Sequence, residues 1–241
     1  MYIKSPINSF FQLNQLKRYL KDIDGAFISG GCFKNIFKNE PVKDIDIFFF
    51  NQQYFEDAVD EYEYNTKYSK LFENDNCIAF KHKKNHTQVE LIRSIFGTPE
   101  EIMNNFDFTI VKACLLKSTQ LPIYPSSTQS VIINSPLTIP IDLFEELRSI
   151  PPAIDFIEEE ANINEESWDF IYHDKFFEHL LLNKLVIDNQ IPKSVATFNR
   201  ALKYAGYGYG LCRESKVKLA NAIIQTGDVE DINNDLYFGW D

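Results

Sequence analysis

The sequence contains no long apolar segment. No stretch approaches the ~18 consecutive apolar residues that a membrane-spanning helix requires. The N-terminal segment MYIKSPINSFFQLNQLKRYL is too polar for the apolar core of a secretory signal. We therefore expect a cytoplasmic protein that does not enter the membrane.

The motifs of several common enzyme classes are also absent. No Cys-x-x-Cys pair occurs, which argues against a zinc ribbon and against thioredoxin-like redox chemistry. No Gly-Lys-Ser/Thr loop is found, which excludes P-loop phosphate binding, and no Gly-x-Ser-x-Gly elbow is found. The four cysteines lie far apart and are expected to be reduced and mostly buried; they are Cys32, Cys77, Cys114 and Cys212.

The composition is that of a folded protein with an uneven distribution of charge. The 241 residues are 44% apolar and 24% charged, with a formal net charge of −11. Residues 142–174 carry eleven acids against Arg148 alone, so the rest of the chain is close to neutral. Six basic residues lie between 193 and 218, where the only acid is Glu214. A solvated face is the simpler interpretation of this basic cluster, but the local acidity does not exclude a polyanionic partner.

Apolar periodicity and turn residues predict an α/β (α+β) protein whose first part is followed by a mostly helical C-terminal region. We expect a first domain over residues 1–120 and a second region over 121–241 that contains the acidic segment. Strands are expected at 25–29, 43–50, 77–82 and 87–93, a β-like run at 131–141, and a strand or helix at 108–116. Helices are expected at 13–20, 32–38, 52–62, from 99 onward, and at 169–187, 193–204 and 213–225, with an aromatic anchor at 236–240.

One constellation carries recognisable chemistry. Gly30-Gly31 ends a predicted strand, and Asp44-Ile45-Asp46 lies on the next one. Two carboxylates at positions i and i+2 of a strand point to the same face, and both remain ionised when a divalent cation lies between them. Oxygen ligands suit Mg²⁺ or Mn²⁺, and a Gly-Gly turn lets backbone N–H groups approach a phosphate closely. This combination is what phosphoryl or nucleotidyl transfer requires.

The run GGCFKNIFKNEPVKDIDIF resembles the signature of the polymerase-β-type nucleotidyltransferase superfamily. It is most similar to the head domain of class II CCA-adding tRNA nucleotidyltransferases and bacterial poly(A) polymerases, whose pattern is Gly-Gly-x-Val-Arg-Asp, a short spacer with Pro, and Lys-Asp-hydrophobic-Asp. The run NNFDFTIVKA is similar to the group's Arg-Arg-Asp-Phe-Thr-hydrophobic-Asn-Ala segment. A weaker match, RALKYAGYGY from Arg200 onward, resembles its Arg-Ala-x-Arg-Phe-Ala helix.

The resemblance implies a nucleotidyltransferase head with a mixed β-sheet flanked by helices. It also implies an enzyme that transfers NMP from an NTP, such as ATP, to an acceptor hydroxyl and releases pyrophosphate. Asp44 and Asp46 would bind the divalent metals, and Gly30, Gly31 and Lys34 would hold the β and γ phosphates. Asp107 would contact the ribose or base of the nucleotide, or the nearby backbone. Arg200 and Lys203 would contact phosphates of the nucleotide or the acceptor.

A third metal-binding carboxylate is expected on a neighbouring strand, and Glu90 is the candidate. An alternative alignment places Gln88 at the acidic position. Gln88 and Glu90 share one face of the strand, so Glu90 would still reach the metals. The competing interpretation is that Glu90 is an ordinary surface residue of a strand.

The sequence departs from the family pattern at several positions, so more than one kind of acceptor is considered. Asn105 and Phe106 replace the paired arginines of the group, and Lys34 and Asn35 replace its Arg and Asp. The first expectation is an RNA 3′ end, including tRNA processing. The alternatives are a protein or small-molecule acceptor, or a nucleotidyltransferase-like protein that binds without turnover. The sequence does not indicate the preferred NTP or the oligomeric state.

Overall fold

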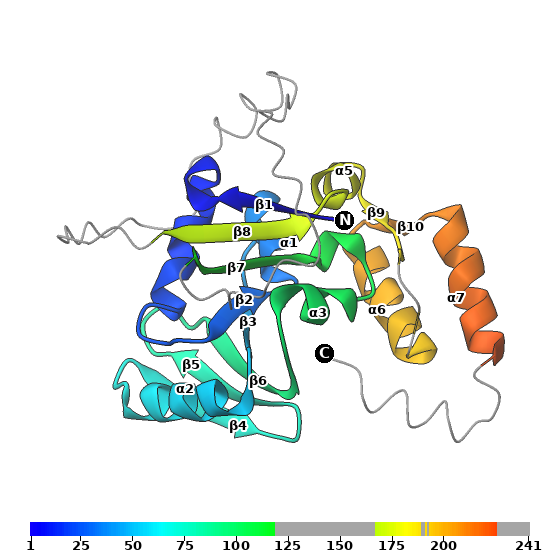
Figure 1. Cartoon of the computed structure of the whole chain (residues 1–241). Coiled ribbons are helices and arrows are strands. Elements are labelled where there is room, and N and C mark those ends of the chain that lie inside the picture. The colour runs from blue at the N-terminus through cyan, green and yellow to red at the C-terminus, as the bar shows by residue number, and fades with distance from the viewer. Residues whose placement is uncertain (119–166, 189–190, 192, 226–241) are drawn as a thin grey trace, which may run out of the picture.

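The computed structural model describes residues 1–118, 167–188, 191 and 193–225 (Figure 1). Its centre is an eight-stranded sheet in the order β1-β8-β7-β2-β3-β6-β5-β4. The strands are β1 Tyr2–Pro6, β2 Ala26–Ser29, β3 Asp44–Phe49, β4 Tyr68–Glu73, β5 Cys77–His82, β6 Gln88–Phe96, β7 Ala113–Lys117 and β8 Trp168–His173. The short strands β9 (Lys184–Leu185) and β10 (Gly210–Leu211) form a separate parallel pair. The mixed sheet with flanking helices confirms the predicted fold class.

The pairing of the strands explains the sequence pattern. β3 and β6 are parallel, whereas the other neighbouring pairs of the large sheet are antiparallel. β2 and β7 lie near the middle of the sheet and are buried along their whole length, in agreement with their continuous apolar sequence. The strands predicted at 77–82 and 87–93 are confirmed as β5 and the first part of β6, and their antiparallel register makes them a hairpin.

Helices cover both faces of the sheet. The α-helices are α1 Cys32–Phe37, α2 Gln52–Tyr64, α3 Pro99–Asn104, α5 Phe176–Leu181, α6 Ser194–Gly206 and α7 Arg213–Gln225. The 3₁₀ helices are η1 Ile7–Ser9, η2 Phe11–Tyr19 and η3 Thr109–Val111. The helix predicted from residue 99 onward is confirmed as α3, which begins at a capping box: Thr98 and Glu101 bind each other's backbone N–H groups. The helix predicted at 13–20 is of the 3₁₀ type, and the segment 108–116 divides into η3 and β7.

Two apolar clusters show which side of the sheet each helix covers. The larger cluster contains Ile45 and Ile47 of β3, together with side chains from η2, α1, α2 and α5. The smaller cluster contains Phe48 of β3 together with Ile102 and Met103 of α3. Because side chains alternate along a strand, Asp44 and Asp46 lie on the face of Phe48, opposite the larger core.

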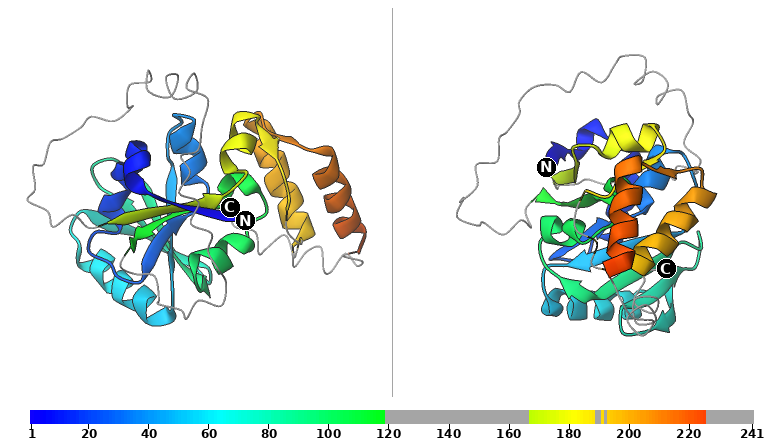
Figure 2. Two further views of the ribbon diagram at one scale, coloured as in Figure 1. Left: turned by 45° about the horizontal axis from the view of Figure 1, so that its top comes forward. Right: turned by 90° about the vertical axis from the view of Figure 1, so that its right-hand side faces the viewer.

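The helices α6 and α7 lie side by side at one end of the sheet (Figures 1 and 2). Both were predicted, and their bounds agree within two residues at each end. The strand pair β9–β10 connects this end of the molecule to α5, because β9 follows α5 and β10 follows α6. None of the helices within the described ranges has the length and apolar character needed to cross a membrane.

The helix predicted over residues 169–187 is wrong. Residues Trp168–His173 form β8, which is wholly buried between β1 and β7, and only Phe176–Leu181 is helical. Its apolar residues Phe170, Ile171 and Tyr172 are consecutive, which suits a strand buried on both faces. The strands that pair with β8 lie more than fifty residues away in the sequence, so local periodicity could not identify them. Strand β8 belongs to the same sheet as the strands before residue 120, so the sheet extends across the predicted division. The division into two domains stays a prediction. The predicted features at 131–141 and 236–240 and most of the acidic segment 142–174 lie outside the described residues.

Candidate functional site

The predicted carboxylates lie on neighbouring strands. In the parallel pair of β3 and β6, Asp44 is in register with Gln88, and Asp46 is in register with Glu90. Residues in register on adjacent strands present their side chains to the same face of a sheet. The sequence therefore places Asp44, Asp46 and Glu90 on the same face of the sheet, opposite the larger core, with Asp46 beside Glu90. Asp44 is exposed, whereas Asp46 and Glu90 are half-buried.

The electrostatics of Asp46 follow from this grouping. Burial raises the pKa of Asp46 well above its usual value, and the neighbouring charges of Glu90 and Asp44 raise it further. The ammonium of Lys203 acts in the opposite direction, which places this α6 residue near the carboxylate. Three acids and one amine thus leave an excess of negative charge, which favours a cation at this site.

Glu90 is held in place by its neighbours. Gln88 Nε2 donates a hydrogen bond to Glu90 Oε1 at 2.6 Å, and the thiol of Cys77 lies 3.6 Å from Glu90 Oε2. Gln88, which the alternative alignment places at the acidic position, is therefore a hydrogen-bond partner of Glu90. Glu90 is the acidic residue that the strand register places beside Asp46.

The Gly-Gly turn lies directly against the carboxylates. Gly30 has a φ of +103°, a conformation that residues with a side chain rarely adopt. A Cβ atom at Gly30 would lie 3.0 Å from Asp46 Oδ2, so the missing side chain lets the turn approach the acid closely. Gly31 is the N-cap residue of α1 and leads the chain into that helix. Gly30 therefore borders the acidic group, and Gly31 connects it to α1.

Lys34 is more enclosed than its predicted role suggests. Its Nζ is paired with Glu40 Oε2 at 2.8 Å, and the side chain is only 6% exposed. Nζ also lies 5.6 Å from the ring centroid of Tyr207 and 5.5 Å from that of Tyr209. A phosphate would therefore have to compete with Glu40 for this ammonium group.

Asp107 and Arg200 are direct partners of each other. Arg200 Nε donates a short hydrogen bond to Asp107 Oδ2, and the hydroxyl of Thr197 donates to Asp107 Oδ1 at 2.7 Å. Arg200 Nη1 is buried without a hydrogen-bond partner among the described residues. Both carboxylate oxygens of Asp107 are thus bound by α6, so the pair joins this helix to the segment before η3. A nucleotide would have to share these groups.

α6 supplies a wall beside the Gly-Gly turn. The hydroxyl of Tyr204 would lie 3.7 Å from a Cβ atom at Gly31, and Lys203 is close enough to Asp46 to lower its pKa. Arg200 lies one turn earlier on the same helix. The C-terminal half of α6 therefore faces the turn and the carboxylates.

The acids fit a divalent ion whose coordination is completed by substrate. Within the part of the chain that the structure describes, no three His, Cys, Asp or Glu side chains converge into a ready-made metal site. Mg²⁺ is commonly bound in proteins through one or two carboxylates, substrate phosphates and water. The uncompensated charge around Asp46 and the all-oxygen donors suit this kind of site.

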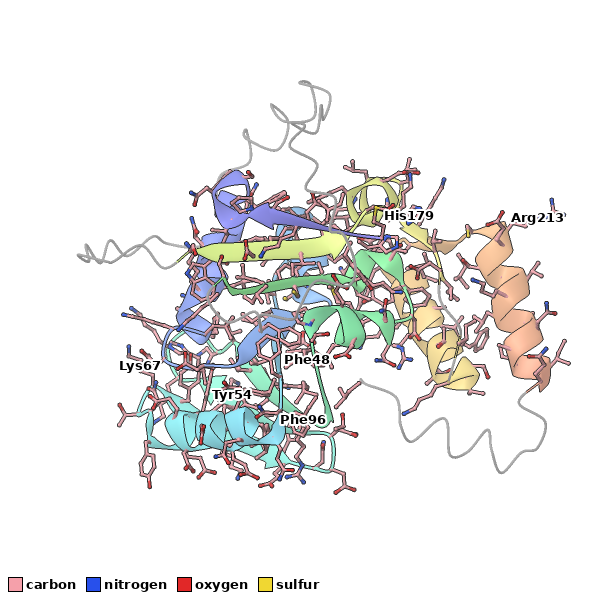
Figure 3. All side chains as sticks on the ribbon, in the orientation of Figure 1. Phe48, Tyr54, Lys67, Phe96, His179 and Arg213 are labelled. Atoms are coloured by element: carbon pink, nitrogen blue, oxygen red, sulfur yellow. The ribbon has the colours of Figure 1, made fainter. Side chains whose placement is uncertain are left out.

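A second polar cluster was not anticipated from the sequence. Lys112 is fully buried and pairs with Asp188 at 2.6 Å, and His173 Nε2 lies 2.9 Å from the other oxygen of Asp188. His179 forms a separate contact, 2.7 Å from the hydroxyl of Thr109, where α5 approaches η3 (Figure 3). The Lys112–Asp188 and Thr109–His179 pairs are separated by 76 and 70 residues in sequence, so no local signal marked them.

Comparison with known proteins identifies a family and a fold. A family model described as "Gad2: Gabija anti-defense 2 family protein" matches residues 2–182. No curated protein matches the chain significantly. Among solved structures, a CCA-adding enzyme with CTP has a TM-score of 0.58 at 9% identity, covering 98% of this chain and 49% of its own.

Two further structures agree with this similarity. A tRNA nucleotidyltransferase with a primer tRNA and an ATP analog has a TM-score of 0.52 at 14% identity, covering 93% of this chain and 55% of its own. A Thermotoga maritima CCA-adding enzyme with tRNA has a TM-score of 0.54 at 10% identity, covering 100% and 52%. The chain thus has a nucleotidyltransferase-like fold and spans about half the length of these enzymes.

Proposed function

The chain belongs to the Gabija anti-defense 2 family, and on that premise we propose that it counters Gabija as a metal-dependent nucleotidyltransferase. The reaction would transfer NMP from an NTP to an acceptor hydroxyl. One observation carries the proposal: Asp46 lies in register with Glu90, shares its face with Asp44, and borders the Gly30 turn. The nucleotidyltransferase-like fold supports the same chemistry.

In this mechanism the acceptor oxygen forms a bond to the α-phosphorus and its proton passes to solvent, while the bond from that phosphorus to the α–β bridging oxygen breaks and pyrophosphate leaves. Asp44, Asp46 and Glu90 would hold Mg²⁺ or Mn²⁺, which supplies charge stabilisation for the phosphates and lowers the pKa of the acceptor hydroxyl. The backbone at Gly30 and Gly31 would hold the β and γ phosphates. Lys203 would offset negative charge on the side of α6.

We propose an RNA 3′ end as the first acceptor to examine. Basic and exposed apolar side chains alternate on the two C-terminal helices, including Phe198 and Lys203 on α6 and Arg213 on α7. Figure 3 shows Arg213 at the start of α7, on the outer side of the molecule. Basic groups bind backbone phosphates, and apolar rings stack on unpaired bases.

A protein acceptor is the second candidate. The chain spans only about half of the tRNA-acting enzymes that it resembles in fold, and the name of its family refers to a defence system. Transfer to a hydroxyl of a protein would use the same carboxylates. A small-molecule acceptor and binding without turnover complete the alternatives.

Labelled transfer tests the proposal. The purified chain is incubated with Mg²⁺ or Mn²⁺, each α-labelled NTP, and separate RNA, protein and small-molecule fractions. We expect label in the RNA fraction and its loss in Asp44→Asn and Asp46→Asn. Asp60→Asn is the matched control, because Asp60 is exposed on α2, which packs on the opposite face of the sheet. Equal transfer by wild type and both site variants would refute the proposed site.

The distribution of label separates the acceptors. Label found only in the protein fraction would replace the RNA acceptor by the second candidate. NTP binding with Mg²⁺ but no label in any fraction would favour binding without turnover. Binding is followed by thermal stabilisation of the chain, which does not depend on the acceptor.

A further inference from the structure

The hydroxyl of Tyr204 lies over the Gly-Gly turn. A Cβ atom at Gly31 would be 3.7 Å from this oxygen, so the two groups face each other across a short gap. Tyr204 is near the C-terminal end of α6, whereas Gly31 begins α1. Tyr204 is partly buried, and its side chain reaches the turn from a helix that is distant in the sequence.

The position of this hydroxyl is fixed by packing. The Tyr204 ring contacts Phe108 edge-on, with the centroids 5.6 Å apart, and it has similar contacts with Tyr207 and Tyr209. The carbonyl of Tyr204 accepts hydrogen bonds from the N–H groups of Tyr207 and Tyr209, each at 3.0 Å. Aromatic contacts on several sides hold the ring in one orientation. The oxygen is thus pre-positioned at the turn.

The charges around Tyr204 favour a hydrogen-bond donor. Burial raises the pKa of Tyr204, and the nearby charge of Asp46 raises it further. The hydroxyl therefore keeps its proton at neutral pH. A protonated phenol beside a phosphate-sized anion donates a charge-assisted hydrogen bond.

We propose that Tyr204 is a binding residue that positions the triphosphate, donating its hydroxyl to a phosphate oxygen held by the Gly30-Gly31 turn. This inference rests on the proposed function. The ring alone would satisfy the aromatic packing, and the helix pattern that the sequence resembles has Phe at this place. The hydroxyl is thus a group beyond the needs of the core, and it supplies a neutral donor in a chain that has Asn105 and Phe106 in place of two arginines.

Equilibrium binding tests the inference without requiring turnover. ATP, inorganic tripolyphosphate and AMP are titrated, with Mg²⁺ and without acceptor, into the wild-type chain and Tyr204→Phe. Tyr64→Phe makes the same chemical change at an exposed position of α2 and is the matched control. Tyr204→Phe keeps the ring, so its thermal unfolding is expected to match that of the wild type.

We expect Tyr204→Phe to weaken binding of ATP and tripolyphosphate about tenfold or more, the typical loss for a hydrogen bond to a charged group. Binding of AMP and all binding by Tyr64→Phe should stay unchanged. In the transfer assay the loss should be in KM for the NTP. Gly31→Ala, whose methyl would project toward the hydroxyl, should give a non-additive effect with Tyr204→Phe, because both variants disturb one phosphate position.

Equal binding of tripolyphosphate by wild type and Tyr204→Phe would overturn the inference. A nucleotidyl adduct on Tyr204, detected by mass spectrometry, would also overturn it, because the hydroxyl would then be an acceptor. Failure of the proposed function would give different results from failure of this inference: the wild type itself would bind no NTP, or Asp46→Asn would transfer label normally.

Discussion

Asp46 on β3 lies in register with Glu90 on β6, so two acids from parallel strands share one face of the sheet beside the Gly30 turn. This relationship has an energetic consequence. The two charges repel, and burial adds to the free-energy cost of keeping Asp46 ionised. A site of this kind is destabilising without a cation and is stabilised when one binds.

The first prediction concerns stability and pH. Because the pKa of Asp46 is raised in the folded chain, the folded state binds its proton more tightly than the unfolded state. Without divalent ions, the contribution of Asp46 should favour folding below the unfolded pKa of about 4, and this contribution should be lost as pH rises through the folded pKa. Asp46→Asn should flatten this part of the profile and raise Tm at neutral pH. Thermal unfolding from pH 4 to 8 measures both effects.

Asp60→Asn is the control for that experiment, since it removes an exposed acid from α2. Added Mg²⁺ should raise the Tm of the wild type more than that of Asp46→Asn. A wild type and an Asp46→Asn variant with the same profile would contradict the proximity of the three acids.

The second prediction concerns the third acid. Glu90→Gln should abolish transfer, because it removes a negative ligand and keeps the size of the side chain. Gln88→Leu should reduce activity or metal affinity by about 10- to 100-fold, the usual effect of removing a group that orients a metal ligand. Transfer rates at several Mg²⁺ concentrations distinguish the two variants, since excess metal should restore Gln88→Leu only. Full activity of Glu90→Gln would show that Glu90 is an ordinary strand residue.

The sequence was most informative where structure is local. The Gly-Gly turn, the start of α3 at residue 99 and the alternation of Asp44 and Asp46 are set by neighbouring residues, and each was predicted correctly. Strand β8 was not, because its identity depends on pairing with β1 and β7, which are distant in sequence.

The same distinction applies to the site. Two acids at i and i+2 of a strand indicate a common face. The expectation that Glu90 lies on a neighbouring strand came from the family resemblance, because the parallel pairing of β3 with β6 joins Asp46 to a residue 44 positions away. The ion pair of Arg200 with Asp107 joins residues 93 positions apart, and no spacing rule relates them. Thr197 lies one turn before Arg200 on α6, so the two side chains share a face of the helix. Once Arg200 is known to bind Asp107, this spacing identifies Thr197 as a second partner of the same carboxylate.

The third prediction concerns Lys34. Glu40 occupies its ammonium group, so Glu40→Gln should strengthen triphosphate binding by removing a competing carboxylate. Lys34→Gln should weaken binding. Calorimetric titration with tripolyphosphate measures both, and urea unfolding reports whether either variant loses stability. If both variants lose stability and neither alters binding, Lys34 only joins α1 to the tyrosines of the C-terminal region.

The fourth prediction concerns the buried cluster at Lys112. The lysine side chain is fully buried, and its partner Asp188 also binds His173 and lies beside Lys218 of α7. Burial alone would raise the pKa of Asp188, but the hydrogen bonds from His173 and Lys112 hold it well below its usual value. Asp188→Asn should therefore destabilise the chain by about 3 kcal/mol, because it leaves a buried ammonium without its counter-charge.

The pH dependence of this cluster has the opposite sign to that of Asp46. A lowered pKa gives stability that is present above the unfolded value of about 4 and is lost as pH falls toward the folded value. Asp174→Asn is the matched control, since this neighbouring acid is 36% exposed and should contribute less than about 1 kcal/mol. Urea unfolding at pH 7, pH 4 and pH 2 should show a large difference between wild type and Asp188→Asn at pH 7 and pH 4 that narrows at pH 2. Equal losses of unfolding free energy in Asp188→Asn and Asp174→Asn would mean that Asp188 acts as a surface residue. The connection between the sheet and α7 would then depend on apolar packing alone.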